Sequence, residues 1–235
     1  MLKLAIRLLP GTVVFALLSG PIPVAPNNGQ SGMKLVSLKH LCVTKGAIKE
    51  LAGPKLEVVQ PEMRAVVAYP TRQEVEAHFT YLGHTRYDKP LASGEVRRQF
   101  GLKLRAQNGC NLVYAMWRIE PRQELVVSVK SNPGQQTSAE CGAHGYTNIT
   151  PDHRAPLPHT EKGFNHTLRA IMEASKLRVF ADGDLVWEGD VGPEALAFDG
   201  PVGVRTDNGR FKFELFAEKD EHGKATPCHG DQGNE

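Results

Sequence analysis

Short stretches of alternating polar and apolar residues, separated by turn-forming residues, recur from residue 74 to residue 217. A period of two is typical of a strand with one buried face, and an Asp-Gly pair such as Asp182-Gly183 is typical of a hairpin turn. The sequence has no long stretch with a helical period, and its 23 Gly and 16 Pro weaken helix interiors. We therefore predict an all-β fold, a sandwich of two antiparallel sheets. The predicted strands are residues 74–81, 96–107, 111–119, 124–130, 166–172, 177–180, 185–187, 200–205 and 211–217.

The first 25 residues have the order of a secretory signal peptide. Lys3 and Arg7 form a short basic segment, an apolar run follows at 8–18, and small and turn-forming residues come next. The apolar run is too short to span a bilayer as a helix, and a buried N-terminal helix is the alternative interpretation. The domain limits predicted on this basis are a signal peptide at 1–25, a linker at 26–33, a β-sandwich domain at 34–217 and a charged tail at 218–235. We expect a secreted or periplasmic protein.

Four cysteines fit export to an oxidising compartment. Their spacing contains no Cys-x-x-Cys pair and matches no zinc motif, so two disulfides are the simplest interpretation. Three connectivities exist, and we favour Cys110–Cys141 together with Cys42–Cys228, which would tie the two ends of the domain together. Four free thiols in a cytosolic protein remain the alternative.

The charges of the chain nearly balance. Lys and Arg number 28 and Asp and Glu number 26, giving a net charge of +2, and loss of Lys3 and Arg7 would leave the mature chain neutral. Nucleic-acid-binding domains usually carry an excess of basic residues, so we expect no nucleic-acid partner. No segment after residue 25 is apolar over a length that would span a membrane. We expect a monomer with no membrane span and no nucleic-acid partner.

The last third of the chain carries a family resemblance. Residues 166–172, 177–189 and 200–209, continuing through 213–215, resemble the closing strands of the concanavalin A-like lectin/glucanase superfamily, including its laminin-G-like modules. The similarity covers about residues 60–217 and implies a jelly roll of two antiparallel sheets. The superfamily includes lectins, glycosidases, polysaccharide lyases and adhesion modules, so the resemblance implies a fold and leaves the function open.

Strand alternation predicts a basic face on one sheet. Phe100, Leu102 and Leu104 should face the core together with Val96, which turns the intervening residues outward. The outward set over three strands is Arg97, Gln99, Lys103, Arg105, Tyr114, Arg118 and Lys130. Guanidinium groups bind carboxylates and a tyrosine stacks under a sugar ring, so we predict that this face binds an anionic, uronate-containing polysaccharide. The alternative is a solvated strand face without a ligand.

The resemblance also frames the candidate catalytic residues. Glucanases of the superfamily carry a Glu-x-Asp-x-x-Glu pattern that this sequence lacks, and neither Glu74 with Glu76, on a strand expected at a sheet edge, nor Glu120 with Glu124 replaces it. Lyases with this fold neutralise the uronate carboxylate with Arg and with Gln or Asn and use Tyr and His as base and acid. By that resemblance the candidates here are Tyr114, His144 and Tyr146, although the lyase motifs Arg-Thr-Glu-Leu-Arg and Gln-Ile-His are absent.

Binding with cleavage by β-elimination is therefore the leading hypothesis, and a lyase is favoured over a glycoside hydrolase if the protein is catalytic. The alternative is a non-catalytic structural or adhesion module. We predict no cofactor and no metal site: Asp207-Asn208-Gly209 offers oxygen atoms to Ca²⁺ but first indicates a turn. His153, His159 and His166 match no metal motif and are interpreted as residues of a solvated loop.

Overall fold

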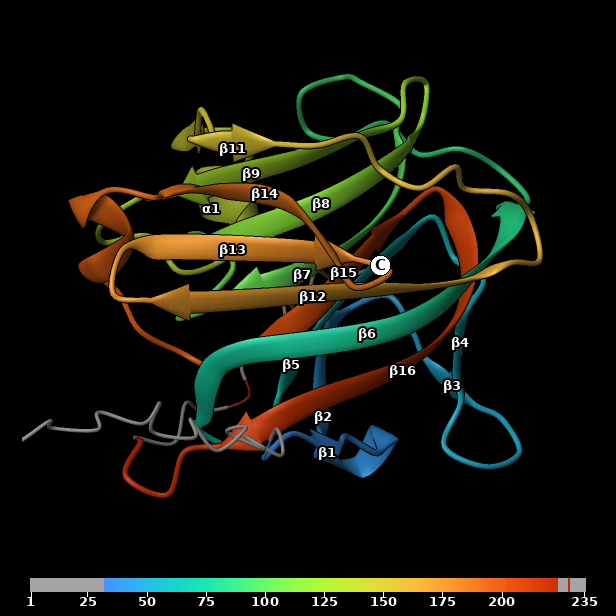
Figure 1. Cartoon of the computed structure of the whole chain (residues 1–235), viewed down its shortest axis with the longest axis horizontal. Helices are drawn as coiled ribbons and strands as arrows, with labels where there is room; N and C mark the ends of the chain where they lie inside the picture. Colours follow the sequence, from blue (N-terminus) through green and yellow to red (C-terminus); the bar gives the residue numbers. More distant parts are fainter. Residues whose placement is uncertain (1–31, 224–227, 229–235) are drawn as a thin grey trace, which may run out of the picture. The chain divides into compact units, whose positions relative to one another are not determined.

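The computed structural model describes residues 32–223 and residue 228. The predicted signal peptide, most of the predicted linker and most of the predicted tail lie outside these residues. In the described part, strands form two antiparallel sheets that face each other (Figure 1). This confirms the predicted all-β jelly roll. The helical segments are short: α1 at Ser138–Cys141 and the 3-10 turns η1 at Leu38–His40 and η2 at Pro193–Leu196.

The larger sheet has nine strands within the described residues. Its order is β11 (His153–Arg154), β14 (Asp184–Asp190), β13 (Lys176–Ala181), β12 (Asn165–Glu173), β6 (Thr71–His84), β16 (Gly209–Lys219), β4 (Leu56–Val58) and β3 (Lys49–Glu50), with β1 (Lys34–Leu35) also paired to β16. The long strand β6 lies between β12 and β16, so the expectation of a sheet edge at Glu74 and Glu76 is wrong. An alternating strand has the same pattern at an edge and at a centre, because only one of its faces is buried in both positions.

The second sheet has seven strands in the same part of the chain. Its order is β10 (Tyr146–Asn148), β9 (Glu124–Lys130), β8 (Leu112–Glu120), β7 (Arg98–Leu104), β15 (Gly203–Asp207), β5 (Glu62–Val67) and β2 (Leu41–Lys45). Strand β15 lies between β7 and β5, which precede it by about a hundred residues or more. The seven-stranded sheet therefore brings together residues that are far apart in the sequence.

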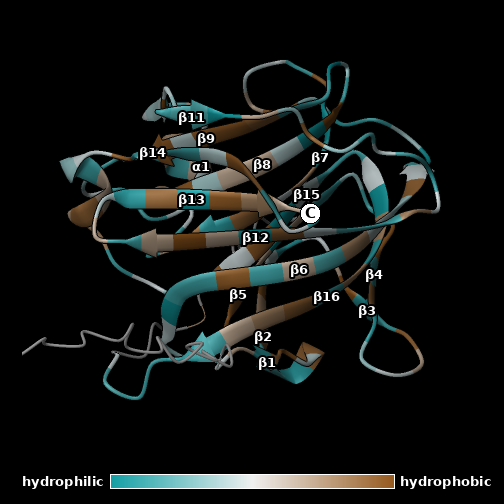
Figure 2. Ribbon diagram, viewed as in Figure 1, coloured by the Kyte–Doolittle hydropathy of each residue, from teal (hydrophilic) through white to brown (hydrophobic). Residues whose placement is uncertain are grey.

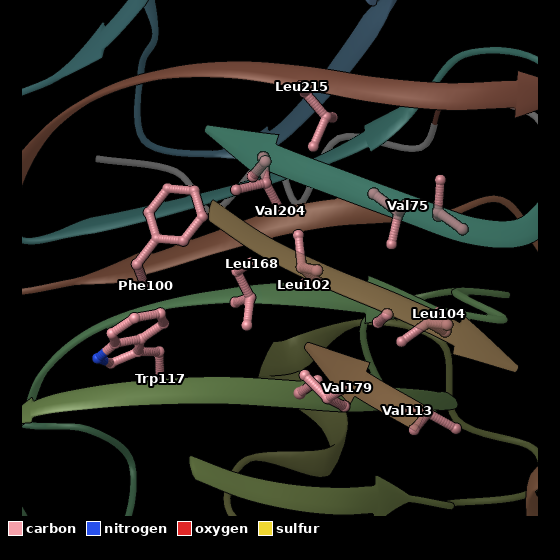
Figure 3. Close-up of a cluster of buried hydrophobic side chains, with 14 of the residues drawn as sticks. Val75, Phe100, Leu102, Leu104, Val113, Trp117, Leu168, Val179, Val204 and Leu215 are labelled. Carbon is pink, nitrogen blue, oxygen red and sulfur yellow. The ribbon is translucent and has the colours of Figure 1, made fainter. Parts of the chain in front are cut away.

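Aromatic and aliphatic side chains fill the space between the sheets. The rings of Phe79 and Phe100 stack with centroids 4.4 Å apart, and Trp117 meets Phe79 edge-on at 5.3 Å. Figure 3 shows Phe100 and Trp117 beside Leu168, three side chains contributed by β7, β8 and β12. Figure 2 shows the corresponding bands of apolar and polar residues along β6, β12 and β13. Burying one such apolar side chain stabilises the fold by about 1.5–3 kcal/mol.

The alternation of β7 separates the core from the opposite face of the sheet, as predicted. Phe100, Leu102 and Leu104 are buried in the core between the sheets. Val96 is instead 38% exposed, because the strand begins only at Arg98. On the opposite face Gly101 has no room for a side chain: an added Cβ would lie 2.3 Å from Sδ of Met116 on the next strand.

His166 lies in the core and not in a solvated loop, which corrects the sequence interpretation. It is 6% exposed on β12, its Nδ1 lies 2.8 Å from Oδ2 of Asp182, and its ring packs against Trp117 at 5.1 Å. The apolar positions of 166–172 placed a strand there, and His166 occupies the first buried position of that strand.

Both favoured disulfides are present. Cys110–Cys141 joins the loop after β7 to α1, and Cys42–Cys228 joins β2 to a residue near the end of the chain. The first disulfide fixes a segment that forms one wall of the pocket described next.

Candidate binding pocket

The outer face of the seven-stranded sheet carries a pocket of about 300 Å³. Every strand of that sheet contributes to the lining, and three connecting stretches, residues 91–97, Gly109 and residues 138–143, complete the walls. The lining residues are Lys45, Glu62, Arg64, Leu91, Ala92, Ser93, Glu95, Arg97, Gln99, Gly109, Tyr114, Met116, Arg118, Val126, Ser128, Lys130, Ser138, Gly142, Ala143, Tyr146, Asn148 and Arg205.

A buried carboxylate organises the floor of the pocket. Asp207 is fully buried and accepts hydrogen bonds from Arg64 Nη2 at 2.6 Å, Gln99 Nε2 at 2.6 Å and Arg205 Nε at 2.8 Å. Burial alone would raise the pKa of Asp207, but Arg205 and Arg64 lower that pKa to about 2. Asp207 is therefore an anion that fixes three lining side chains at once.

The orientation of the Gln99 amide follows from this contact. An ionised carboxylate only accepts hydrogen bonds, so the amide nitrogen of Gln99 must face Asp207. The amide oxygen Oε1 is buried and has no hydrogen-bond partner among the described residues. Arg118 lies directly opposite Gln99 on β8, and its Nε is also buried without a hydrogen-bond partner among the described residues. Buried polar atoms without partners are rare, and a ligand or water commonly satisfies them at binding sites.

Two tyrosines form the opposite part of the pocket. Tyr114 and Tyr146 stack with ring centroids 6.2 Å apart and planes inclined by 19°. The Arg205 guanidinium lies 4.8 Å from the centroid of Tyr114, and its Nη1 is 3.4 Å from the hydroxyl oxygen of Tyr146. Tyr114 is buried, whereas Tyr146 is 41% exposed.

The environments of the two hydroxyls move their pKa values in opposite directions. Burial raises the pKa of Tyr114 to about 12. Burial also acts to raise the pKa of Tyr146, but the charges of Arg205 and Lys130 outweigh it and lower that pKa below its ordinary value. Tyr146 is consequently the tyrosine of the pair that loses its proton more readily.

Lys130 stabilises the wall beside Tyr146. Its Nζ donates to the carbonyl oxygens of Gly109 at 3.2 Å and Gly142 at 3.0 Å, and it lies 5.0 Å from the centroid of Tyr146. Gly109 and Gly142 adjoin the two half-cystines Cys110 and Cys141, so the disulfide and the ammonium hold the same two segments. Burial lowers the pKa of Lys130.

The structure brings together six of the predicted binding and catalytic residues. Arg97, Gln99, Tyr114, Arg118, Lys130 and Tyr146 all line the pocket. Gln99 and Lys130 are each 2% exposed, because the connecting segments cover part of a face that the sequence had suggested was open.

The remaining three predicted residues do not line this pocket. Lys103 is 3% exposed. Arg105 donates from Nε to the Phe198 carbonyl at 2.8 Å and lies near Asp199. His144 is exposed on the segment that follows α1, next to the lining residue Ala143.

Sequence reasoning missed Arg64, Arg205 and Asp207. The strand at 200–205 was predicted, but its position between β7 and β5 was not. The available signal was the alternation of Val202 and Val204 with Arg205, which turns Arg205 away from the core. The carboxylate of Asp207 faces two guanidinium groups, so the suggestion that it could serve Ca²⁺ is wrong. Among the described residues, no group of three or more His, Cys, Asp and Glu is arranged to hold a metal ion.

Comparison with known proteins supports the fold. A carbohydrate-binding module, CBM66 from Bacillus subtilis, matches with a TM-score of 0.50 at 10% identity, over 74% of this chain and 91% of the module. This likeness in fold is consistent with the expected concanavalin A-like jelly roll. More distant likenesses are the Crh5 transglycosylase, with a TM-score of 0.47, 12% identity and coverage of 81% and 85%, and a putative glycosyl hydrolase from Parabacteroides distasonis, with a TM-score of 0.44, 10% identity and coverage of 80% and 89%.

At the level of sequence, no family model and no curated protein matches the chain. The fold is thus one that a carbohydrate-binding module also has, and at this level of identity the likeness extends to the fold alone. In the part of the chain that the structure describes, no helix is long and apolar enough to cross a membrane.

Proposed function

We propose that the protein binds an anionic, uronate-containing polysaccharide in the pocket of the seven-stranded sheet. The observation that supports this most is the lining, which combines six cationic side chains with two carboxylates, Glu62 and Glu95, and two tyrosines. Guanidinium groups pair with carboxylates through two parallel hydrogen bonds, and a tyrosine ring offers a surface for sugar stacking. The lining draws on all seven strands, which at a spacing of about 4.8 Å extend over about 29 Å.

The second part of the proposal is cleavage by β-elimination. A base removes the proton at C5 of the uronate, the bond from C4 to the glycosidic oxygen breaks, a C4–C5 double bond forms, and an acid protonates the leaving oxygen. Arginines near the uronate carboxylate would make the C5 proton more acidic. Two oppositely shifted titratable groups side by side are the arrangement that such chemistry needs.

Tyr146 is the proposed base. Its partial exposure, its contact with Arg205 and its lowered pKa support this role. Tyr114 keeps its proton because burial raises its pKa to about 12. Tyr114 and His144 are the two candidates for the acid. His144 lies outside the lining, so it would need a movement of the segment after α1 toward the bound chain.

We also propose that the mature chain is exported and acts as a monomer. Two disulfides in a domain of this size are typical of an oxidising compartment outside the cytoplasm. The proposed cleavage of a signal peptide within residues 1–25 can be checked by N-terminal sequencing of protein from the producing cells.

The test uses alginate, pectate, glucuronan and hyaluronate. Retardation in affinity gels measures binding, and ultraviolet absorbance of unsaturated uronate measures elimination. We expect retardation by at least one polymer, weaker in Arg118→Ala than in Arg178→Ala. Arg178 is a matched control because it lies on β13 of the other sheet, paired with the exposed Glu173.

Retardation without absorbance would mean that the protein binds the polymer but does not cleave it. No retardation by any of the polymers would contradict the proposal and favour a structural module.

A further inference from the structure

The six cations of the pocket are not equally free to meet a ligand. Arg64 donates from Nη1 to the Met63 and Thr206 carbonyls and from Nη2 to Asp207. Arg205 is bonded to the same buried carboxylate. These two guanidinium groups are therefore committed to the floor of the pocket.

Two lysines are committed as well. Lys130 gives two of its three protons to backbone carbonyls. Lys45 lies 3.7 Å from Glu62, a carboxylate that is only 15% exposed and is also held by Lys89. Both ammonium groups are thus held by groups of the protein, Lys130 by two backbone carbonyls and Lys45 by Glu62.

Arg97 and Arg118 differ from these four. Arg118 donates from Nη1 to Glu124, a carboxylate that is also paired with Arg122 and Arg154. Arg97 is paired with Glu95, whose side chain is 53% exposed. Both residues line the pocket, Arg118 directly opposite Gln99 and Arg97 two residues before Gln99. Burial and then the charge of Arg118 lower the pKa of Arg97. The carboxylates of Glu95 and Glu124 act in the opposite direction but do not cancel this effect on the pKa of Arg97. An anion bound near both guanidinium groups is therefore favoured.

Glu95 lies in the segment 89–97. Different hydrogen bonds hold the two ends of this segment, Lys89 and Arg97, and its tip, residues 91–95. The buried Asn208 accepts from the Lys89 amide at 2.7 Å and donates to the carbonyls of Lys89 and Arg97. The tip closes on itself, since the Leu91 amide donates to the Glu95 carbonyl and the Gly94 amide to the Leu91 carbonyl. Glu95 can leave Arg97 while Asn208 keeps the backbone of Arg97 in place.

We propose that a carboxylate of the ligand binds between Arg97 and Arg118 and displaces the Glu95 carboxylate from the Arg97 guanidinium. Glu95 is then an intramolecular competitor that sets the affinity for uronates. This inference rests on the proposed function and identifies which of the six cations takes the carboxylate.

The test compares binding of tetragalacturonate and tetraguluronate by calorimetry. Glu95→Gln should bind whichever probe the wild type binds about two- to fivefold more tightly, the range expected for loss of an exposed ion pair. Asp199→Asn is the control for net charge, because Asp199 is an exposed carboxylate that does not line the pocket. It should leave the affinity unchanged.

A double-mutant cycle decides whether the effect passes through Arg97. Arg97→Gln should weaken binding, and Glu95→Gln should bring no gain in that background. Binding by the wild type that is unchanged in Glu95→Gln, or a gain that persists without Arg97, would overturn this inference alone. Failure of wild type and Glu95→Gln to bind either probe would overturn this inference, and no retardation by any of the four polymers would overturn the proposed function with it.

Discussion

Arg205 and Asp207 form a buried ion pair, with Nε and Oδ2 2.8 Å apart, beneath the pocket on the seven-stranded sheet. They stand two residues apart on β15 and so share one face of the strand. Arg205, which Asp207 holds in place, also lies with its Nη1 3.4 Å from the hydroxyl oxygen of Tyr146. This pair connects the stability of the sheet to the chemistry of the pocket.

Asp207→Asn should destabilise the protein by about 3–5 kcal/mol, because it leaves Arg64 and Arg205 buried without a counter-charge. Urea unfolding measures the change. The control is Asp184→Asn in the exposed β13–β14 hairpin, which should cost less than about 0.5 kcal/mol. Equal midpoints for Asp207→Asn and the wild type would show that the pair contributes nothing to stability.

Stability should also fall in acid because of Asp207. Its pKa is about 2 in the folded protein against an ordinary value of 3.8, so the unfolded chain takes up a proton first as the pH drops. The stabilisation is therefore complete above pH 4 and is lost as the pH falls toward 2, by about 2 kcal/mol. Denaturation midpoints between pH 5 and pH 2 should show a smaller decline in Asp207→Asn than in the wild type. Parallel declines would contradict the assignment.

The two stacked tyrosines should titrate apart. We expect Tyr146 to ionise below the ordinary tyrosine range and Tyr114 near pH 12, because Arg205 and Lys130 stabilise the first phenolate and burial opposes the second. Phenolate absorbance against pH in Tyr146→Phe should lose the earliest transition. Tyr87→Phe, which removes a 64% exposed ring, should leave that transition intact. An early transition that survives Tyr146→Phe would assign it to another residue.

The Cys110–Cys141 disulfide should matter to the pocket and the Cys42–Cys228 disulfide should not. Replacing either pair by serines should cost about 2–4 kcal/mol of stability. Only Cys110→Ser/Cys141→Ser should also weaken uronate binding, because it releases the Gly109 and Gly142 carbonyls that hold Lys130. Calorimetric affinities of the two double variants test this difference. Equal affinities would mean that the wall keeps its form without the disulfide.

The local alternation of polar and apolar residues located most of the strands, but it did not show which strands pair with each other. The alternation of Phe100, Leu102 and Leu104 placed Gln99 on the outer face of the sheet, and the Asp182-Gly183 pair placed a hairpin where the structure has one. The pairing of β15 with β7 and β5 depends on contacts across more than ninety residues, which no short pattern encodes. For this reason Arg205 and its partner Asp207 were not placed beside Arg97 and Arg118, and Arg64 was missed because no strand was predicted at 62–67, where the structure has β5.

The local pattern also did not show that connecting segments cover part of the predicted face. Lys130 alternates like a solvent-facing residue, yet the segments around Gly109 and Gly142 cover it. His144 shows the converse: its Gly-rich surroundings suggested a position at the rim, and the structure leaves it exposed next to the lining and outside it.

The most direct test of the account is calorimetric binding of one uronate polymer and of the same polymer after reduction of its carboxyl groups to alcohols. We expect the wild type to bind the uronate form with an affinity that falls as salt is added, and to bind the reduced form at least tenfold more weakly, since about 1.4 kcal/mol from one carboxylate contact is a factor of ten. Equal affinity for the two forms, or no binding to either, would contradict the claim that the cationic pocket recognises an anionic glycan.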